Sequence, residues 1–239
     1  MSRPYVLVHG AMRGAWLWDR VVPLLEKAGA KAYALDLPGH GARGGDRKGI
    51  TVHTYSDDVA RFIKDKDLRE VILVGHSMGG IIISKAAELV SDRLAHLVYL
   101  AAAVLADGQA LIDTLPPDRG DLYRQAAAAS PDNTIFAPIE TLKTLHFTDL
   151  TDAEKDEWVR KMTPQPFAIF SDKVDLNRFY ALNIPKTYIL ATQDKALVPQ
   201  KCREFAARIG CTPIEIEGSH DVMVSRPAEV ARLLLAIPH

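Results

Sequence analysis

An α/β fold, with a mainly parallel sheet of about six strands and helices on both faces, is the architecture that this sequence predicts. Short aliphatic or β-branched runs recur along the chain, and segments with helical apolar spacing separate most of them. Such alternation indicates parallel strands that are buried on both faces. One long stretch lacks these runs and predicts a helical insertion. The expected strands lie at residues 4–9, 31–36, 71–75, 96–101, 186–192 and 212–217.

The intervals between the first four expected strands have the spacing of helices. Apolar residues recur every three or four positions around residues 16–25, 55–63 and 81–90. Two more helices are expected, one near residues 199–209 and one that opens at Pro227, because the fixed φ of proline suits a first helical turn. Helical connections between parallel strands predict a sheet that is covered on both faces.

The insertion differs from the rest of the chain in pattern and in charge. Its segments are helical and separated by prolines, and Thr151 with Glu154 forms a capping-box pattern that predicts a helix containing Trp158. Residues 107–180 carry 13 acidic and 8 basic side chains, a net −5, although the whole chain is at −1.

This contrast predicts two parts of the molecule. We expect a core at residues 1–105 and 182–239 and a helical cap, or lid, at residues 106–181. The cap is expected over the carboxyl ends of the strands, where open α/β sheets bind ligands. The alternative is a helical excursion on the surface that has no role in substrate binding.

Composition excludes several classes of partner. A chain of 239 residues with a net charge of −1 has no general attraction for nucleic acid or anionic membranes. It has no apolar run long enough to span a bilayer and no signal-peptide pattern at its start, so a cytoplasmic location is expected. Cys202 and Cys211 form no metal-site spacing, which predicts reduced thiols. No constellation of ligands for a metal or an organic cofactor appears, so none is expected.

The strongest motif is a GxSxG string at a strand-to-helix junction. The expected strand at residues 71–75 runs into Gly75, and Ser77 and Gly79 complete the motif before a helical pattern. A sharp turn exposes the Ser77 hydroxyl as a nucleophile, while the glycines permit close packing of strand and helix. The Met78 amide at the helix start can stabilise an oxyanion. The alternative is a glycine turn with a bystander serine.

A serine nucleophile needs a base and an acid that orients the base. His220 follows the last expected strand, and Asp194 follows the strand before it, so both return to the sheet edge that carries Ser77. The order Ser77, Asp194, His220 is the order of a triad on this architecture. Asp175 and Asp221 are the competing acids.

A second oxyanion donor is expected in the loop after the first strand. Gly10 and Ala11 follow that strand, and the Ala11 amide is the candidate donor. The alternative is that Gly10 and Gly14 only shape the turn.

These segments resemble the α/β-hydrolase fold superfamily, and within it the group that contains plant methyl-ester esterases and hydroxynitrile lyases. The chain looks like a small, bacterial-type carboxylesterase of this group. The likeness covers nearly all of the core and only thinly covers the insertion, and it implies a Ser-His-Asp triad and commonly a homodimer. The matching strings are VLVHGAMRGAW (6–16), VVPLL (21–25), ALDL (34–37), VILVGHSMGG (71–80), QD (193–194) and EGSHDVMV (217–224).

Three positions depart from the lyase pattern of the resembling group. There the lyases carry threonine, glutamate and lysine, whereas this chain has Gly10, His76 and Asp221. An acidic Asp221 is expected to disfavour cyanide. Dehalogenases and epoxide hydrolases that share this fold use an aspartate nucleophile. Position 77 is a serine, so the resemblance does not extend to their chemistry.

The sequence therefore predicts a serine esterase that cleaves a small, neutral carboxylic ester through an acyl-enzyme intermediate. Lactonase, thioesterase, amidase or lyase activity at the same site remains an alternative, as does a ligand receptor with a vestigial triad. Gly10, Trp158 and Phe167 are candidate substrate contacts. Aromatic residues of the insertion either line an apolar cleft or form the insertion's own core: Phe136, Phe147, Trp158, Phe167 and Phe170.

Overall fold

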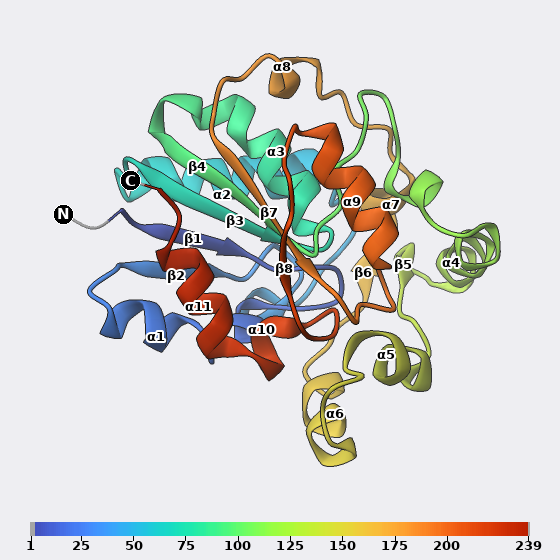
Figure 1. Ribbon diagram of the computed structural model, residues 1–239. Helices are drawn as coiled ribbons and strands as arrows, with labels where there is room; N and C mark the ends of the chain where they lie inside the picture. The colour runs from blue at the N-terminus through green and yellow to red at the C-terminus, as the bar shows by residue number, and fades with distance from the viewer. Residues whose placement is uncertain (1–2, 239) are drawn as a thin grey trace.

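The computed structural model describes residues 3–238 and contains a six-stranded parallel sheet (Figure 1). Every neighbouring pair of strands is parallel, so the predicted α/β architecture is confirmed. In spatial order the strands are β2 (Ala32–Leu35), β1 (Tyr5–Val8), β3 (Val71–His76), β4 (Leu94–Leu100), β7 (Lys186–Ala191) and β8 (Ile214–Ile216).

Helices cover both faces of this sheet. One layer holds α1 (Val22–Lys27), α10 (Val222–Ser225) and α11 (Pro227–Leu235), and the opposite layer holds α2 (Val52–Asp65), α3 (Gly79–Val90) and α9 (Pro199–Arg208). Short 3₁₀ helices lie at Ala15–Trp18, Gly41–Arg43, Ser91–Arg93 and Leu111–Thr114.

Tyrosines on the strands mark the two faces. The Tyr5 hydroxyl donates to the Leu234 carbonyl of α11. On the other face, the Tyr99 hydroxyl is 2.8 Å from the Ser84 hydroxyl of α3, and the Tyr99 ring stacks on Tyr188. Burial of the aliphatic strand residues between these layers provides the main driving force for folding.

The inserted segment, residues 106–181, is mostly helical. Its helices are α4 (Pro117–Ala129), α5 (Ile139–His146), α6 (Asp152–Val159), α7 (Ala168–Ser171) and α8 (Asn177–Tyr180). The predicted capping box begins α6, with the Thr151 side chain accepting from the Glu154 amide. The expectation of no strand here was wrong, because β5 (Thr134–Ile135) pairs with β6 (Gln165–Pro166). Two-residue strands are too short to leave a periodic signal.

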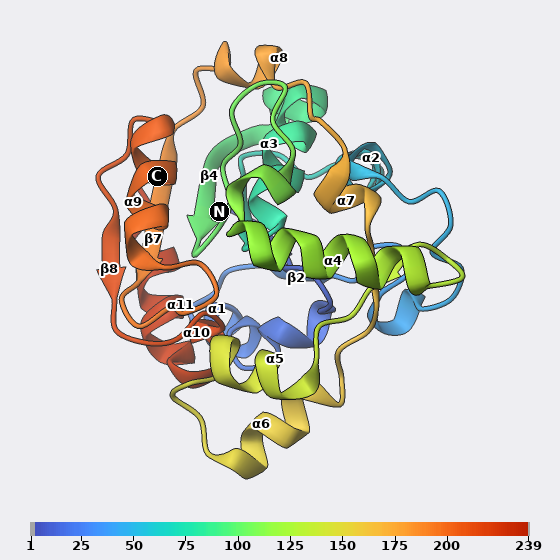
Figure 2. The same ribbon diagram turned by 90° about the vertical axis from the view of Figure 1, so that its right-hand side faces the viewer.

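Most of the inserted segment lies beyond the carboxyl ends of the strands (Figures 1 and 2). The Thr163 amide donates to the carbonyl of Met12, which follows β1. The Asp221 amide, after β8, donates to the carbonyl of His146 at the end of α5. The segment is therefore fixed to the loops at the edge of the sheet.

No helix within residues 3–238 is both long and apolar enough to cross a membrane. Cys202 is buried, Cys211 is partly buried, and both are free thiols.

Candidate active site

Ser77 occupies the turn between β3 and α3 in a left-handed backbone conformation, with φ of 53°. A side chain rarely adopts this conformation without strain. Close packing around the turn explains the glycines of the motif. A Cβ on Gly75 would lie 2.6 Å from the Gly79 carbonyl oxygen, and one on Gly79 would lie 2.8 Å from the Val8 carbonyl oxygen.

The fold brings the three predicted triad residues together. His220 Nε2 lies 2.9 Å from Ser77 Oγ, and His220 Nδ1 lies 2.6 Å from Asp194 Oδ2. His220 and Asp194 are almost fully buried. This geometry allows the imidazole to accept the serine proton while the carboxylate holds its Nδ1–H tautomer.

The loop after β7 holds the Asp194 carboxylate in place. Its Oδ1 accepts hydrogen bonds of 2.8 Å from both the Ala196 and the Leu197 amides, which leaves Oδ2 for His220. Asp175, one competing acid, is exposed in the inserted segment and accepts a hydrogen bond from the Asn177 amide.

Asp221, the other competitor, is committed to a different partner. Both of its carboxylate oxygens bind the Arg13 guanidinium, at 2.8 Å and 2.5 Å, and both side chains are buried. Arg13 also donates to the Ala11 carbonyl. The Arg13–Asp221 pair joins the loop after β1 to the loop that carries His220.

The predicted oxyanion donors lie at the same cavity as Ser77. Ala11 and Met78 both line it, and neither of their amides has a hydrogen-bond partner within residues 3–238. Met12 has a φ of 66°, and its amide donates to the buried Gln165 side chain at 3.1 Å. The inserted segment thereby fixes the backbone beside Ala11, and the two free amides can donate hydrogen bonds to a developing oxyanion.

Two buried histidines lie beside the His220 ring. The His76 and His146 rings lie 4.7 Å and 4.9 Å from the His220 ring. Burial, followed by nearby positive groups that include Arg13, holds the pKa of both histidines well below the usual value, so both are neutral at neutral pH. The sequence did not point to His146, because a lone histidine in a helix carries no local signal of its tertiary contacts.

The predicted substrate contacts do not all lie at the cavity. Trp158 stacks on Trp16 at 5.6 Å between ring centroids and does not line the cavity, and Phe167 does not line it either. Phe170 does line it. Gly10 lies against the nucleophile, since a Cβ at that position would be 2.8 Å from the Ser77 Cβ.

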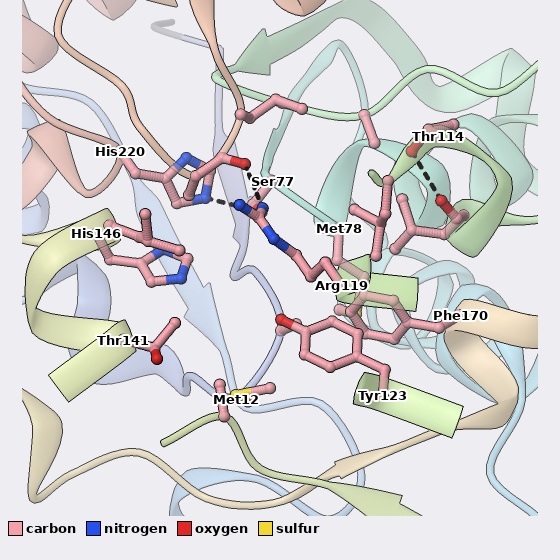
Figure 3. Close-up of a pocket in the computed structure, with 18 of the residues that line it drawn as sticks. Met12, Ser77, Met78, Thr114, Arg119, Tyr123, Thr141, His146, Phe170 and His220 are labelled. Atoms are coloured by element: carbon pink, nitrogen blue, oxygen red, sulfur yellow. Dashed lines mark hydrogen bonds between the residues drawn. The ribbon is translucent and has the colours of Figure 1, made fainter. Parts of the chain in front are cut away.

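The cavity is built from both parts of the chain (Figure 3). The core supplies the triad serine and histidine, the Ala11 to Arg13 loop and residues after β4 and β7, while α4, α5 and α7 close the other side. Its lining residues are Ala11, Met12, Arg13, Ser77, Met78, Ala103, Leu111, Thr114, Leu115, Arg119, Tyr123, Ala137, Thr141, Leu145, His146, Phe170, Ala196, Leu197 and His220.

Comparison with known proteins places this geometry in a family. Residues 5–233 match the model of the "Alpha/beta hydrolase family". A carbendazim hydrolyzing esterase from Nocardioides sp. (strain SG-4G) is 31% identical over 98% of this chain and 98% of its own length. The putative chloroplastic methylesterase 13 of Arabidopsis thaliana is 32% identical over 99% of this chain, but this chain spans only 56% of that relative.

A solved structure shows the same fold at high similarity. It is an extracellular alpha/beta-hydrolase from a Paenibacillus species, described as sharing structural and functional homology with tobacco Salicylic Acid Binding Protein 2. It superposes with a TM-score of 0.92 at 30% identity and covers 98% of each chain. The chain therefore belongs to the alpha/beta hydrolase family.

Proposed function

We propose that this protein is a serine hydrolase that cleaves a small carboxylic ester through an acyl-enzyme intermediate on Ser77. The observation that carries the proposal is the hydrogen-bonded series from Ser77 through His220 to Asp194 at a cavity with two free amides. The esterase names of the relatives support the same class of reaction.

The geometry suggests roles for each group in the reaction. His220 Nε2 takes the Ser77 proton as Oγ attacks the ester carbonyl, and Asp194 stabilises the resulting imidazolium. The Ala11 and Met78 amides bind the oxyanion. His220 then protonates the leaving alcohol and activates a water molecule that releases the acid from Ser77.

The inserted segment at residues 106–181 has the role of a cap in this proposal. It supplies one wall of the cavity and, through Gln165, supports the loop that carries the Ala11 amide. Substrate selection is therefore assigned to α4, α5 and α7, rather than to the Trp158 region.

A lyase remains the alternative from a different reaction class. The electrostatic argument against it is weaker than the sequence suggested, because Arg13 neutralises Asp221. Cleavage of mandelonitrile at a rate that matches or exceeds ester hydrolysis would favour the lyase.

The direct test measures steady-state hydrolysis of p-nitrophenyl acetate and labelling by a fluorophosphonate probe. We expect the wild-type protein to turn over many times and to be labelled once, and Ser77→Ala to lose both properties. Ser56→Ala, which removes a buried hydroxyl in α2, is the matched control and should retain turnover within about twofold. Stoichiometric ligand binding without turnover on any ester would instead support a receptor.

A further inference from the structure

Four polar side chains lie among apolar ones on the wall of the cavity opposite the core. Arg119 and Tyr123 extend from α4, while Thr141 and His146 extend from α5, and all four line the same cavity as Ser77 (Figure 3). The Arg119 guanidinium donates to the carbonyl of Ala196, a cavity residue that follows β7 (Figure 3). We call these four residues, Arg119, Tyr123, Thr141 and His146, the polar wall.

The polar wall has unused hydrogen-bonding capacity. Among the described residues, the Tyr123 and Thr141 hydroxyls make no hydrogen bond, and the buried His146 Nδ1 has no partner. Arg119 uses one amino group, which donates to the Ala196 carbonyl at 2.9 Å. A guanidinium has five N–H donors, so most of them remain available. Polar groups that face a cavity are satisfied either by water or by a ligand, so these donors are available to a substrate that enters.

Among the described residues that line the cavity, Arg119 carries the one charge that no carboxylate pairs. Arg13 is neutralised by Asp221, whereas Arg119 has no carboxylate within ion-pair distance in the described part of the chain. No aspartate or glutamate of residues 3–238 is among the lining residues. Arg119 also lies in the first turn of α4, where the helix dipole is already positive and a cation is unfavourable for the helix. Its placement is therefore better explained by a ligand than by helix stability.

We propose that the polar wall binds a carboxylate that the ester substrate carries, with Arg119 as the main determinant of specificity. This inference rests on the proposed function and specifies the class of its substrate: a monoester of a dicarboxylic acid, or an acyl ester of a hydroxy acid. Arg119 supplies charge-assisted donors, and Tyr123 and Thr141 supply neutral ones. The substrate thus has one negative charge, in contrast to the neutral ester that the sequence predicted. The acidic residues that give the segment its net −5 do not line the cavity, so the charge of the segment does not determine the charge of the substrate.

A purely structural role for Arg119 makes a different prediction. Its bond to the Ala196 carbonyl steadies the loop whose amides hold Asp194. If that were its only role, removing Arg119 would slow charged and neutral esters equally, because both depend on the same triad.

Isosteric ester pairs separate these roles. On the acyl side, monomethyl glutarate is compared with methyl 4-nitrobutanoate, in which a neutral nitro group replaces the carboxylate. On the alcohol side, 4-acetoxybutanoate is compared with 3-nitropropyl acetate. We expect the wild-type kcat/KM to favour the carboxylate in at least one pair. Arg119→Gln should lower kcat/KM for that carboxylate roughly 10- to 100-fold, the range for hydrogen bonds to a charged group, and change the nitro ester less than about threefold.

Two variants sharpen the comparison. Arg119→Lys should restore part of the charge preference. Arg124→Gln removes another arginine of α4, one that pairs with Asp121 and does not line the cavity, and should leave the preference unchanged. An equal loss for both members of each pair in Arg119→Gln, or no preference in the wild type, overturns the proposal.

Binding measurements keep this test independent of the chemistry. In a Ser77→Ala background, calorimetry compares the affinity for each carboxylate ester with that for its nitro partner, with and without Arg119→Gln. Tighter binding of a carboxylate that depends on Arg119 supports the polar wall even if no ester is hydrolysed, an outcome that would refute only the proposed function. Hydrolysis of both members without discrimination refutes only the carboxylate site.

Discussion

Arg13 and Asp221 form a buried, two-point ion pair beside His220, with Nε to Oδ1 at 2.8 Å and the second contact at 2.5 Å. The pair joins the loop of the free Ala11 amide to the loop of His220. Its members are 208 positions apart in the sequence, so the pair fixes the relative position of two distant segments of the site.

Breaking this pair on one side should destabilise the fold strongly. Arg13→Leu leaves the Asp221 carboxylate buried without a partner, which is expected to cost about 3–5 kcal/mol in the free energy of unfolding. Urea denaturation measures this cost. The double variant Arg13→Leu/Asp221→Leu removes the stranded charge and should recover much of the loss. A loss below about 1 kcal/mol in Arg13→Leu would show that the pair is not a structural element.

Replacing Ser77 with glycine should raise the stability of the fold and abolish activity. The Ser77 φ of 53° is strained for a serine and permitted for glycine, so Ser77→Gly is expected to raise the free energy of unfolding by about 1 kcal/mol. The same change removes the nucleophile and should lower kcat by roughly 10⁴-fold or more. Ser77→Ala, which keeps the strain, should lose the same activity without the gain. If Ser77→Gly and Ser77→Ala unfold at equal urea concentrations, the strain argument is wrong.

The tight packing of α3 against the loop after β4 should make Gly80 intolerant of a side chain. A Cβ at this position would lie 2.4 Å from the Ala103 carbonyl oxygen. Because that oxygen belongs to the backbone, the clash can be relieved only by shifting the chain. Gly80→Ala is expected to cost about 3 kcal/mol or more. Gly44→Ala is the control, because its Cβ would meet its nearest atom at 3.4 Å and its φ is −53°. Thermal unfolding of both variants tests the contrast.

Stability should fall as the solution is acidified below about pH 6.5. Burial lowers the pKa of His9 to about 4 and holds that of His146 well below its usual value, so the folded state resists protonation that the unfolded chain accepts. Each such histidine contributes a slope of up to about 1.4 kcal/mol per pH unit, with stability lost as the pH falls. Unfolding of wild type and His146→Phe at pH 6.5, 6 and 5 measures the share of His146. An unchanged slope in the variant would contradict the argument.

Local sequence patterns were sufficient to predict the core and the proximity of Ser77, Asp194 and His220. The strands at residues 71–75 and 186–192 were visible as apolar runs, and in a parallel sheet all carboxyl ends meet at one edge. Ser77, Asp194 and His220 follow three such ends, which is why the sequence alone predicts their proximity.

The residues of the inserted segment could not be placed in this way. A helix leaves a periodic pattern but does not show which of its faces meets the cavity. Trp158 turned out to stack on Trp16, whereas Tyr123 and Phe170 reached the cavity. No pattern in the sequence distinguished these aromatic residues from one another.

The sequence by itself therefore determined the α/β architecture, the strand-to-helix turn at Ser77 and the edge of the sheet where chemistry is expected, because all of these depend on local periodicity and chain order. Only the tertiary structure decided the charge and the walls of the cavity. Arg13 is neutralised by Asp221 from the other end of the chain, and within residues 3–238 Arg119 has no acidic partner. Such pairings depend on contacts between distant segments, and neither composition nor net charge shows which charges are paired.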